Sequence, residues 1–239
     1  MLRLNGTELM ISDKHRTLFV HIPKVAGQSI ETMFLNDLDL TWEQRDVLLM
    51  RKKKPTEKGP FRLAHLTAEE YVKYDYIPQE LYDSYFKFSF VRNPFSRTYS
   101  FYKYLGYSKI CDFDFFVTKV LKKKVEDDHF FFRPQSAYVY KDDKLYVDFI
   151  GRFEQLQKDM DAIFEKCNLK SNKLPFVNKS RQDYSRVKGL LWRNPSLLFN
   201  YKPNSKIYKD FREAYSSRSK EGVKKIYSAD LDKFQYSFE

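Results

Sequence analysis

The chain has 239 residues, of which 42% are hydrophobic and 18% aromatic, with only 7 Gly and 9 Pro. This composition excludes disordered and fibrous proteins, and a chain of this length buries enough apolar surface to fold without disulfides or a structural metal. The formal net charge of +11 indicates an anionic partner. Charge alone does not distinguish nucleic acid, an acidic membrane, a polyanionic sugar and a phosphorylated small molecule.

The two cysteines, Cys111 and Cys167, form neither a CxxC pair nor a regular framework, which disfavours a disulfide scaffold or a zinc site and favours a reducing compartment. In residues 1–16, polar residues recur every few positions. This segment therefore contains neither the apolar core of a signal peptide nor the roughly 20 apolar residues of a membrane span. We therefore expect a soluble, cytoplasmic protein without a membrane anchor. No linker divides the chain, so we expect a single domain over residues 1–239, with 1–16 as an N-terminal extension.

Short apolar runs alternate with helical patterns along the chain. Thr67 and Glu70 fit a capping box, which predicts a helix start. Strands are expected at residues 17–22, 61–65, 85–91 and 145–150, and helices at 28–40, 95–104, 112–124, 153–167 and 220–234.

Strands that alternate with helices favour a mostly parallel sheet that is covered on both faces. In such an architecture ligands bind at the carboxyl ends of the strands. The residues that directly follow each strand are therefore the first candidates for a functional site.

The segment from His21 to Ile30 joins the first long strand to its helix through a small-residue turn with one lysine. A turn into a helix N-terminus points several N–H groups at one place, where the helix dipole favours negative charge. Gly27 lets the backbone approach an oxyanion, Lys24 supplies a mobile cation, and Ser29 adds a hydroxyl donor. The segment predicts a phosphate site, with a plain connection as the alternative. It differs from the triphosphatase pattern GxxxxGK[ST], because Lys24 precedes Gly27.

The strand at 85–91 is followed directly by Arg92, and Ser100 comes about two helical turns later. Magnesium-dependent NTPases commonly carry an aspartate at such a strand end to hold the metal. A guanidinium there favours a second anion site instead, because an arginine and a hydroxyl can hold a terminal phosphate from several directions.

These two segments resemble the donor-binding motifs of the PAPS-dependent sulfotransferases, specifically the carbohydrate-type branch (sulfotransferase family 2); PAPS is 3′-phosphoadenosine 5′-phosphosulfate. HIPKVAGQSI is similar to the 5′-phosphosulfate loop and FSFVRNPFSRTYSFY to the 3′-phosphate motif. The resemblance extends from about residue 17 to the end of the chain, with weaker similarities in the family's order at residues 64–68, 129–135, 148–154, 174–180 and 226–234.

The resemblance implies a three-layer α/β/α sandwich with a mostly parallel central sheet, similar to the P-loop NTPases. It implies transfer of a sulfuryl group from PAPS to an acceptor hydroxyl, with PAP (adenosine 3′,5′-bisphosphate) as the product and no metal. Gln28 departs from the family's usual Thr, which removes one hydroxyl contact but keeps the N–H group. The residues implied to bind the donor are Lys24, Ala26, Gly27, Gln28, Ser29, Arg92, Ser100, Lys179, Ser180 and Arg181.

In-line transfer needs a base for the acceptor proton and a positive charge beside the leaving oxygen. Lys24 suits the second role and His65, expected just before a helix cap, suits the first. The similarity of AHLTA to the family supports His65 as the base, although a histidine at a helix start can instead bond turn backbone. His129 is the rival base, and with Arg133 and Gln135 it is expected to line the acceptor side.

The remaining polar residues suggest no further chemistry. His21 is expected to steady the phosphate loop and His15 to be solvated, and the histidines form no metal set at ligand spacing. The basic runs 51–54 and 122–124 are expected to be solvated faces that could steer an acidic glycan. Most of the 18 Tyr and 22 Phe are expected in the core.

The favoured acceptor is a carbohydrate or other hydroxyl compound, and the excess charge makes an acidic one more plausible than a neutral one. No nucleic-acid recognition motif is present, so no nucleic-acid partner is expected. Two alternative functions remain: a P-loop-like small-molecule kinase, and a non-catalytic nucleotide- or anion-binding module.

Overall fold

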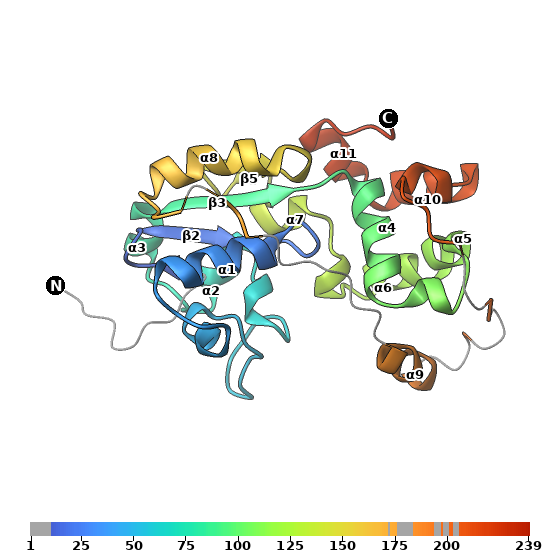
Figure 1. Cartoon of the computed structure of the whole chain (residues 1–239), viewed down its shortest axis with the longest axis horizontal. Coiled ribbons are helices and arrows are strands. Elements are labelled where there is room, and N and C mark those ends of the chain that lie inside the picture. The colour runs from blue at the N-terminus through green and yellow to red at the C-terminus, as the bar shows by residue number, and fades with distance from the viewer. Residues whose placement is uncertain (1–10, 172, 176–183, 194–196, 198–200, 203–205) are drawn as a thin grey trace. The chain divides into compact units, whose positions relative to one another are not determined.

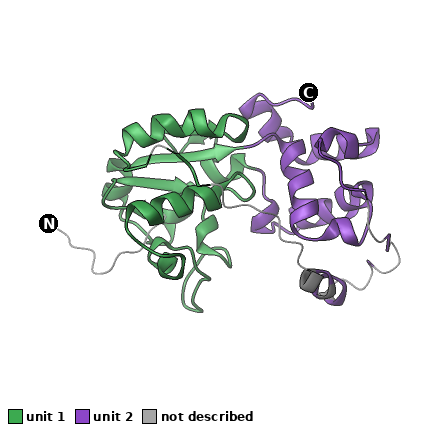
Figure 2. Ribbon diagram, in the orientation of Figure 1, with its two compact units in different colours: residues 1–91, 135–178 green, residues 92–134, 179–239 purple. Residues whose placement is uncertain are grey.

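A computed structural model of the chain describes residues 11–171, 173–175, 184–193, 197, 201–202 and 206–239 (Figure 1). The chain divides into two compact units. Unit 1 comprises residues 1–91 and 135–178, and unit 2 comprises residues 92–134 and 179–239 (Figure 2). The expected single domain over residues 1–239 stays a prediction.

Unit 1 is built around a four-stranded sheet with the strand order β1-β2-β3-β6. β1 pairs antiparallel with β2, whereas β2, β3 and β6 run parallel to one another. This confirms the expected mixed α/β fold with a mostly parallel sheet; the three-layer arrangement and the likeness to P-loop NTPases stay predictions. The strands are β1 (Ile11–Ser12), β2 (Thr17–Val20), β3 (Phe86–Val91) and β6 (Phe149–Arg152).

Both central strands are buried on both faces. All four side chains of β2 are buried, as are all those of β3 except Phe86. Because successive side chains of a strand point to opposite faces, this pattern means that both faces of the sheet are covered. The rings of Phe19 and Phe88 stack with their centroids 5.0 Å apart. Ser89 Oγ donates to Val20 O at 2.7 Å, which satisfies the buried hydroxyl.

The helices of unit 1 begin where the sequence provides caps. The predicted capping box at Thr67 is confirmed, because Glu70 N donates to Thr67 Oγ1 at 3.2 Å and Thr67 N donates to Glu70 Oε2 at 2.9 Å. Helix α8 packs against β6. The helices and short turns of unit 1 are α1 (Gly27–Asp37), η1 (Trp42–Leu48), η2 (Leu63–His65), α2 (Ala68–Lys73), α3 (Gln79–Ser84), α7 (Ser136–Val139), η6 (Phe153–Gln155) and α8 (Leu156–Lys166).

Two strand predictions need correction. The expected strand at 61–65 is wrong: Leu63–His65 forms a single 3-10 turn, because a short buried run can hide its apolar side chains in a turn as well as in a strand. The strand expected at 145–150 begins later. Its first residue, Leu145, belongs to the hairpin of β4 (Tyr140–Lys141) with β5 (Lys144–Leu145), and Asp148 bonds to the main chain of Lys87 before β6 starts.

Unit 2 consists of helices around an aromatic core. The expected helix at 112–124 contains a π-helical stretch, and the expected C-terminal helix at 220–234 is divided at Tyr227. The elements are α4 (Pro94–Tyr104), η3 (Tyr107–Lys109), α5 (Phe113–Phe115), η4 (Phe116–Leu121), α6 (Lys122–Glu126), η5 (Phe130–Phe132), α9 (Tyr184–Arg193), η8 (Phe211–Ala214), α10 (Ser217–Ile226) and α11 (Ser228–Phe234).

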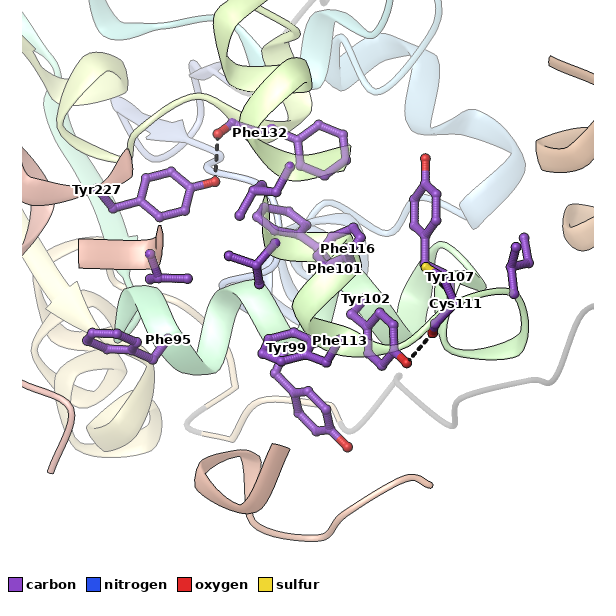
Figure 3. Packing of buried hydrophobic residues seen from close by; sticks show 14 of the residues in the cluster. Phe95, Tyr99, Phe101, Tyr102, Tyr107, Cys111, Phe113, Phe116, Phe132 and Tyr227 are labelled. Carbon is purple, nitrogen blue, oxygen red and sulfur yellow. Dashed lines mark hydrogen bonds between the residues drawn. The ribbon is translucent and has the colours of Figure 1, made fainter. Parts of the chain in front are cut away.

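Figure 3 shows how the aromatic core of unit 2 is packed. Two of its buried tyrosines donate their hydroxyl groups to backbone carbonyls: Tyr102 to Cys111 O at 2.7 Å and Tyr227 to Phe132 O at 2.9 Å. Many aromatic residues of unit 2 lie in this core, and the expectation that most of the chain's Tyr and Phe are core stays a prediction. Among the described residues, no helix has the length and apolar composition that crossing a membrane would require.

Asp37, the last residue of α1, joins three segments of unit 1. Its carboxylate accepts hydrogen bonds from Lys14 Nζ at 2.8 Å, His15 Nε2 at 2.7 Å and Lys170 N at 2.6 Å. Burial alone would raise the pKa of Asp37, but these bonds outweigh it and lower the pKa to about 2. The expectation that His15 is solvated is wrong, since its side chain is only 3% exposed and also bonds Ser12.

Replacing Asp37 by Asn should lower the free energy of unfolding at pH 7. The folded-state pKa lies below the ordinary value of 3.8, so the carboxylate stabilises the fold above about pH 4 and loses this effect as the pH falls towards 2. The shift corresponds to about 2 kcal/mol at neutral pH. Urea unfolding of both proteins between pH 7 and pH 3 should therefore show a difference that shrinks in acid.

The matched control is Asp39→Asn. The side chain of Asp39 is 81% exposed and pairs only with the exposed Lys170 side chain at 2.9 Å among the described residues. Its replacement should leave the unfolding free energy nearly unchanged. Equal losses in the two variants would contradict the role given to Asp37.

Candidate active site

The loop after β2 contains two residues in the left-handed backbone region. Lys24 has φ of 72° and Ala26 has φ of 69°, whereas Val25 between them does not have a positive φ. The left-handed conformation costs a non-glycine residue roughly 1–2 kcal/mol, and such backbone strain concentrates at binding and catalytic sites. Alternation of this kind turns successive N–H groups towards one side, which makes a concavity for an anion.

The loop leads directly into the N-terminus of α1. Ala26 is the N-cap, and its carbonyl accepts from Ser29 N at 2.9 Å. Among the described residues, no hydrogen bond uses the N–H groups of Gly27 and Gln28. Lys24 and Ala26 are partly exposed, Gln28 is exposed, and Gly27 and Ser29 are buried. The structure thus gathers the predicted loop residues at the positive end of an 11-residue helix.

Gly27 is required for a reason that the sequence did not reveal. A Cβ atom at this position would lie 1.9 Å from Nε2 of His21, so the imidazole of His21 occupies the space of a side chain. The same ring stacks on Phe19 at 5.5 Å, and its Nδ1 lies 2.6 Å from Oε1 of Glu31. His21 is therefore packed against the start of α1, as expected of a residue that steadies the loop.

His65 lies beside His21. The two rings meet edge to face, with centroids 4.5 Å apart and an interplanar angle of 61°. His65 Nδ1 is 2.9 Å from the carbonyl oxygen of His21. Because a carbonyl only accepts, Nδ1 carries the hydrogen, and the neutral ring has its lone pair on Nε2. The contact with the carbonyl of His21 thus favours the neutral tautomer of His65 in which Nδ1 carries the hydrogen.

In unit 2, Arg92 stands directly before α4. Asn93 caps the helix by accepting from Phe95 N at 3.0 Å, and Pro94 takes its first position. Arg92 Nε donates to Ser96 Oγ at 2.9 Å. Ser96 was not singled out from the sequence, although it lies one turn before Ser100 on the same helix face.

Lys103 extends this face by another turn. Its pKa is lowered first by burial and then by the positive charge of Arg92. Two cations placed near one another are unfavourable for each other and attract an anion. Sequence reasoning missed Lys103; the spacing of residues 96, 100 and 103, which places all three on one face of α4, was the signal that could have found it.

The second arginine of the same motif has a structural role. Arg97 is completely buried, its Nη1 donates to Arg133 O at 3.1 Å, and its guanidinium lies 4.8 Å from the ring centroid of Phe101. Arg92 is only partly buried. Of the two, Arg92 is the candidate for ligand binding.

The residues expected on the acceptor side lie in both units. In unit 2, the imidazole of His129 caps η5, because its Nδ1 accepts from Phe131 N at 3.3 Å, and burial lowers the pKa of His129. Arg133 forms two 2.8 Å bonds to Asp128. In unit 1, Gln135 is completely buried next to α7. Their contact with an acceptor stays a prediction.

Lys179, Ser180 and Arg181 lie outside the described residues. The basic run 51–54 is not simply a solvated face, because Arg51 makes bonds of 2.6 Å and 2.7 Å to Glu57 and its side chain is 12% exposed. In the run 122–124, Lys122 and Lys123 are exposed. Within the described part of the chain, no group of three or more His, Cys, Asp or Glu could hold a metal ion.

Replacing Gly27 by Ala should destabilise the fold by roughly 1–3 kcal/mol, because the new Cβ collides with His21. Adding His21→Ala should recover much of the loss, because it removes the colliding ring. Urea unfolding of the wild type, both single variants and the double variant forms a mutant cycle. Additive losses would contradict the contact. Gly189→Ala in α9 is the control, since nothing lies within 4 Å of its added Cβ.

A model of the sulfotransferase family matches residues 7–237. No curated protein and no solved structure matches the chain. The matched range includes the loop after β2, His65 and the segment that begins at Arg92, and the mixed α/β fold is consistent with a sulfotransferase. Because the match covers nearly the whole sequence, the chain belongs to the sulfotransferase family.

Proposed function

We propose that the chain transfers a sulfuryl group from PAPS to an acceptor hydroxyl on a carbohydrate or glycoconjugate. The observation that carries the proposal is the strained loop at the start of α1, where Lys24 and the N–H groups of Gly27 and Gln28 suit an anionic group. Membership of the sulfotransferase family supports the reaction class. PAPS carries anionic groups at both ends of its adenosine, which accounts for a second cationic segment at Arg92.

The donor's two ends are assigned to different residues. The loop from Lys24 to Ser29 is proposed to bind the 5′-phosphosulfate, and Arg92 with Ser100 to bind the 3′-phosphate. Ser96 and Lys103 join the second group. Ser96 accepts a hydrogen bond from Arg92, and the positive charge of Arg92 contributes to the lowered pKa of Lys103. By resemblance alone, Lys179, Ser180 and Arg181 are proposed to close over the nucleotide.

In the proposed transfer, the acceptor oxygen forms a bond to sulfur while the bond between sulfur and the 5′-phosphate oxygen breaks. The acceptor's proton passes to Nε2 of His65. The electron pair of the broken bond stays on the phosphate oxygen of the departing adenosine 3′,5′-bisphosphate, where the ammonium of Lys24 stabilises the charge. Proton, sulfuryl group and charge are thus all accounted for without another reactant.

His65 is favoured over His129 by the tautomers of the two rings. The Nδ1–H of His65 donates to a carbonyl, which leaves the lone pair on Nε2. In His129 the lone pair of Nδ1 is already used to accept the N–H of Phe131. His129 would have to break this cap before Nδ1 could take a proton.

The net charge of +11 supports an acidic acceptor, because a positive surface raises the encounter rate with anions. A small-molecule kinase is disfavoured by the family match and by Arg92 in the place of a metal-binding aspartate. A non-catalytic binding module would share the loop geometry, so only a transfer assay separates it from an enzyme.

Adenosine 3′,5′-bisphosphate should raise the melting temperature of the wild-type chain, and Arg92→Ala should weaken its binding roughly 10- to 100-fold, the effect of losing a charged hydrogen-bonding partner. Calorimetric titration gives the affinity directly. Arg212→Ala is the control in the same unit, because Arg212 pairs with Asp210 on the surface. Stronger stabilisation by ATP with Mg²⁺ would overturn the proposed donor and favour a kinase.

His65→Ala should bind the bisphosphate like the wild type but lose turnover by roughly 100-fold or more, as expected for a general base. The assay uses PAPS labelled with radioactive sulfate and a panel of acidic glycans, neutral glycans, lipids and phenols. His129→Ala should change turnover by only a few-fold. Retained turnover in His65→Ala would move the base to His129, and unlabelled acceptors throughout would favour a binding module.

A further inference from the structure

Helix α1 carries two buried pairs of a histidine with a carboxylate. At its C-terminal end Asp37 contacts His15 at 2.7 Å, and one turn after the phosphate loop Glu31 contacts His21 at 2.6 Å. The first pair ties the chain before β2 to the helix. The second joins the residue that follows β2 to the first turns of the same helix, and the side chain of Glu31 is only 7% exposed. Burial of a carboxylate is costly unless it is paired, so this placement needs a reason.

The neighbours of His21 provide that reason. Its Nδ1 faces Glu31, its Nε2 faces Gly27, and its ring meets the ring of His65 edge to face at 4.5 Å. The carbonyl of the same residue accepts the Nδ1–H of His65 at 2.9 Å. His21 therefore contacts His65 with both its side chain and its main chain.

Glu31 affects two neighbouring side chains, His21 and Tyr71. The Oε1 atom of Glu31 lies 2.6 Å from Nδ1 of His21, a close contact without hydrogen-bond geometry that restricts how the ring can turn. After burial, the charge of Glu31 is the next cause that raises the pKa of Tyr71, a buried residue of α2 whose hydroxyl has no hydrogen-bond partner among the described residues. Glu31 thus acts inside a small buried polar cluster and not at the surface.

We infer that Glu31 is a positioning residue for His65 and acts through His21. By holding the imidazole of His21 in place, it keeps the ring and carbonyl that orient His65 and set its tautomer. This inference rests on the proposed function, in which Nε2 of His65 takes the acceptor's proton. Outer partners that orient metal-ligating histidines typically contribute 10- to 100-fold to activity, and we expect a similar range for a histidine that takes a proton.

The kinetic test compares Glu31→Ala, Glu31→Gln and Asp37→Ala. Glu31→Ala should lower kcat roughly 10- to 100-fold and leave the affinity for adenosine 3′,5′-bisphosphate within about three-fold of the wild type. Glu31→Gln should recover most of the loss, because it keeps the length of the side chain and an oxygen atom close to Nδ1 of His21. Asp37→Ala, the matched pair on the same helix, should lower stability but keep kcat at temperatures well below its melting temperature.

His21→Ala supplies the coupling test. Since Glu31 is proposed to act only through His21, the variant that lacks both side chains should have a kcat close to that of His21→Ala alone. Multiplied losses in the double variant would overturn the inference. Equal loss of bisphosphate affinity and kcat in Glu31→Ala would also overturn it, because Glu31 would then support the phosphate loop instead of His65.

A measurement without turnover separates this inference from the proposed function. Long-range proton–nitrogen correlation spectra of the ¹⁵N-histidine-labelled chain report which ring nitrogen of His65 carries hydrogen. The wild type and Asp37→Ala should show the Nδ1–H form, whereas Glu31→Ala should show a mixture and Glu31→Gln should stay close to the wild type. An unchanged tautomer in Glu31→Ala would contradict the positioning role. A changed tautomer in a chain that sulfates no acceptor would retain that role and overturn the proposed reaction.

Discussion

The parallel pairing of β2 with β3, buried on both faces, determines where the chemistry of unit 1 can lie. A strand that is covered on both faces presents polar groups only where it ends. β2 ends at Val20, and the chain must then turn within a few residues into α1. The two left-handed residues Lys24 and Ala26 make this turn, and their strain is stored at the place where the N–H groups of the helix begin.

The packing of side chains at the end of β2 constrains the loop as much as its charge does. The imidazole of His21 fills the position that a side chain of residue 27 would need, so the loop, the histidine and the glycine are interdependent. Glu31 holds that imidazole from one side and His65 lies against it on another. The proposed anion-binding loop and the candidate base are therefore both in contact with one side chain, so a small change in this cluster would affect both.

Much of this organisation was readable from local sequence. The strand and helix around residues 17–40, the capping box at Thr67 and the helix after Arg92 follow from periodicity and cap residues, which act over a few positions. The strand expected at 61–65 failed because a run this short has no periodicity that separates a strand from a turn. His15 was misjudged because its partner Asp37 is distant in the sequence and reaches it only through packing.

The sequence by itself determined the alternation of strands and helices, the two cationic segments that follow strands, and through them the sulfotransferase family. These depend on neighbouring residues and on the order of motifs along one chain. Only the tertiary structure decided that Glu31 contacts His21, that Nδ1 of His65 bonds a backbone carbonyl, and that the charge of Arg92 helps to lower the pKa of Lys103. The contact between His21 and His65 needs segments far apart in the sequence to be packed together. The contact between His21 and Glu31 needs the turn from β2 into α1 to bring the two side chains together, and the third case needs the depth to which Lys103 is buried in the folded unit. All three depend on distances of a few ångströms, where charges and polar contacts act.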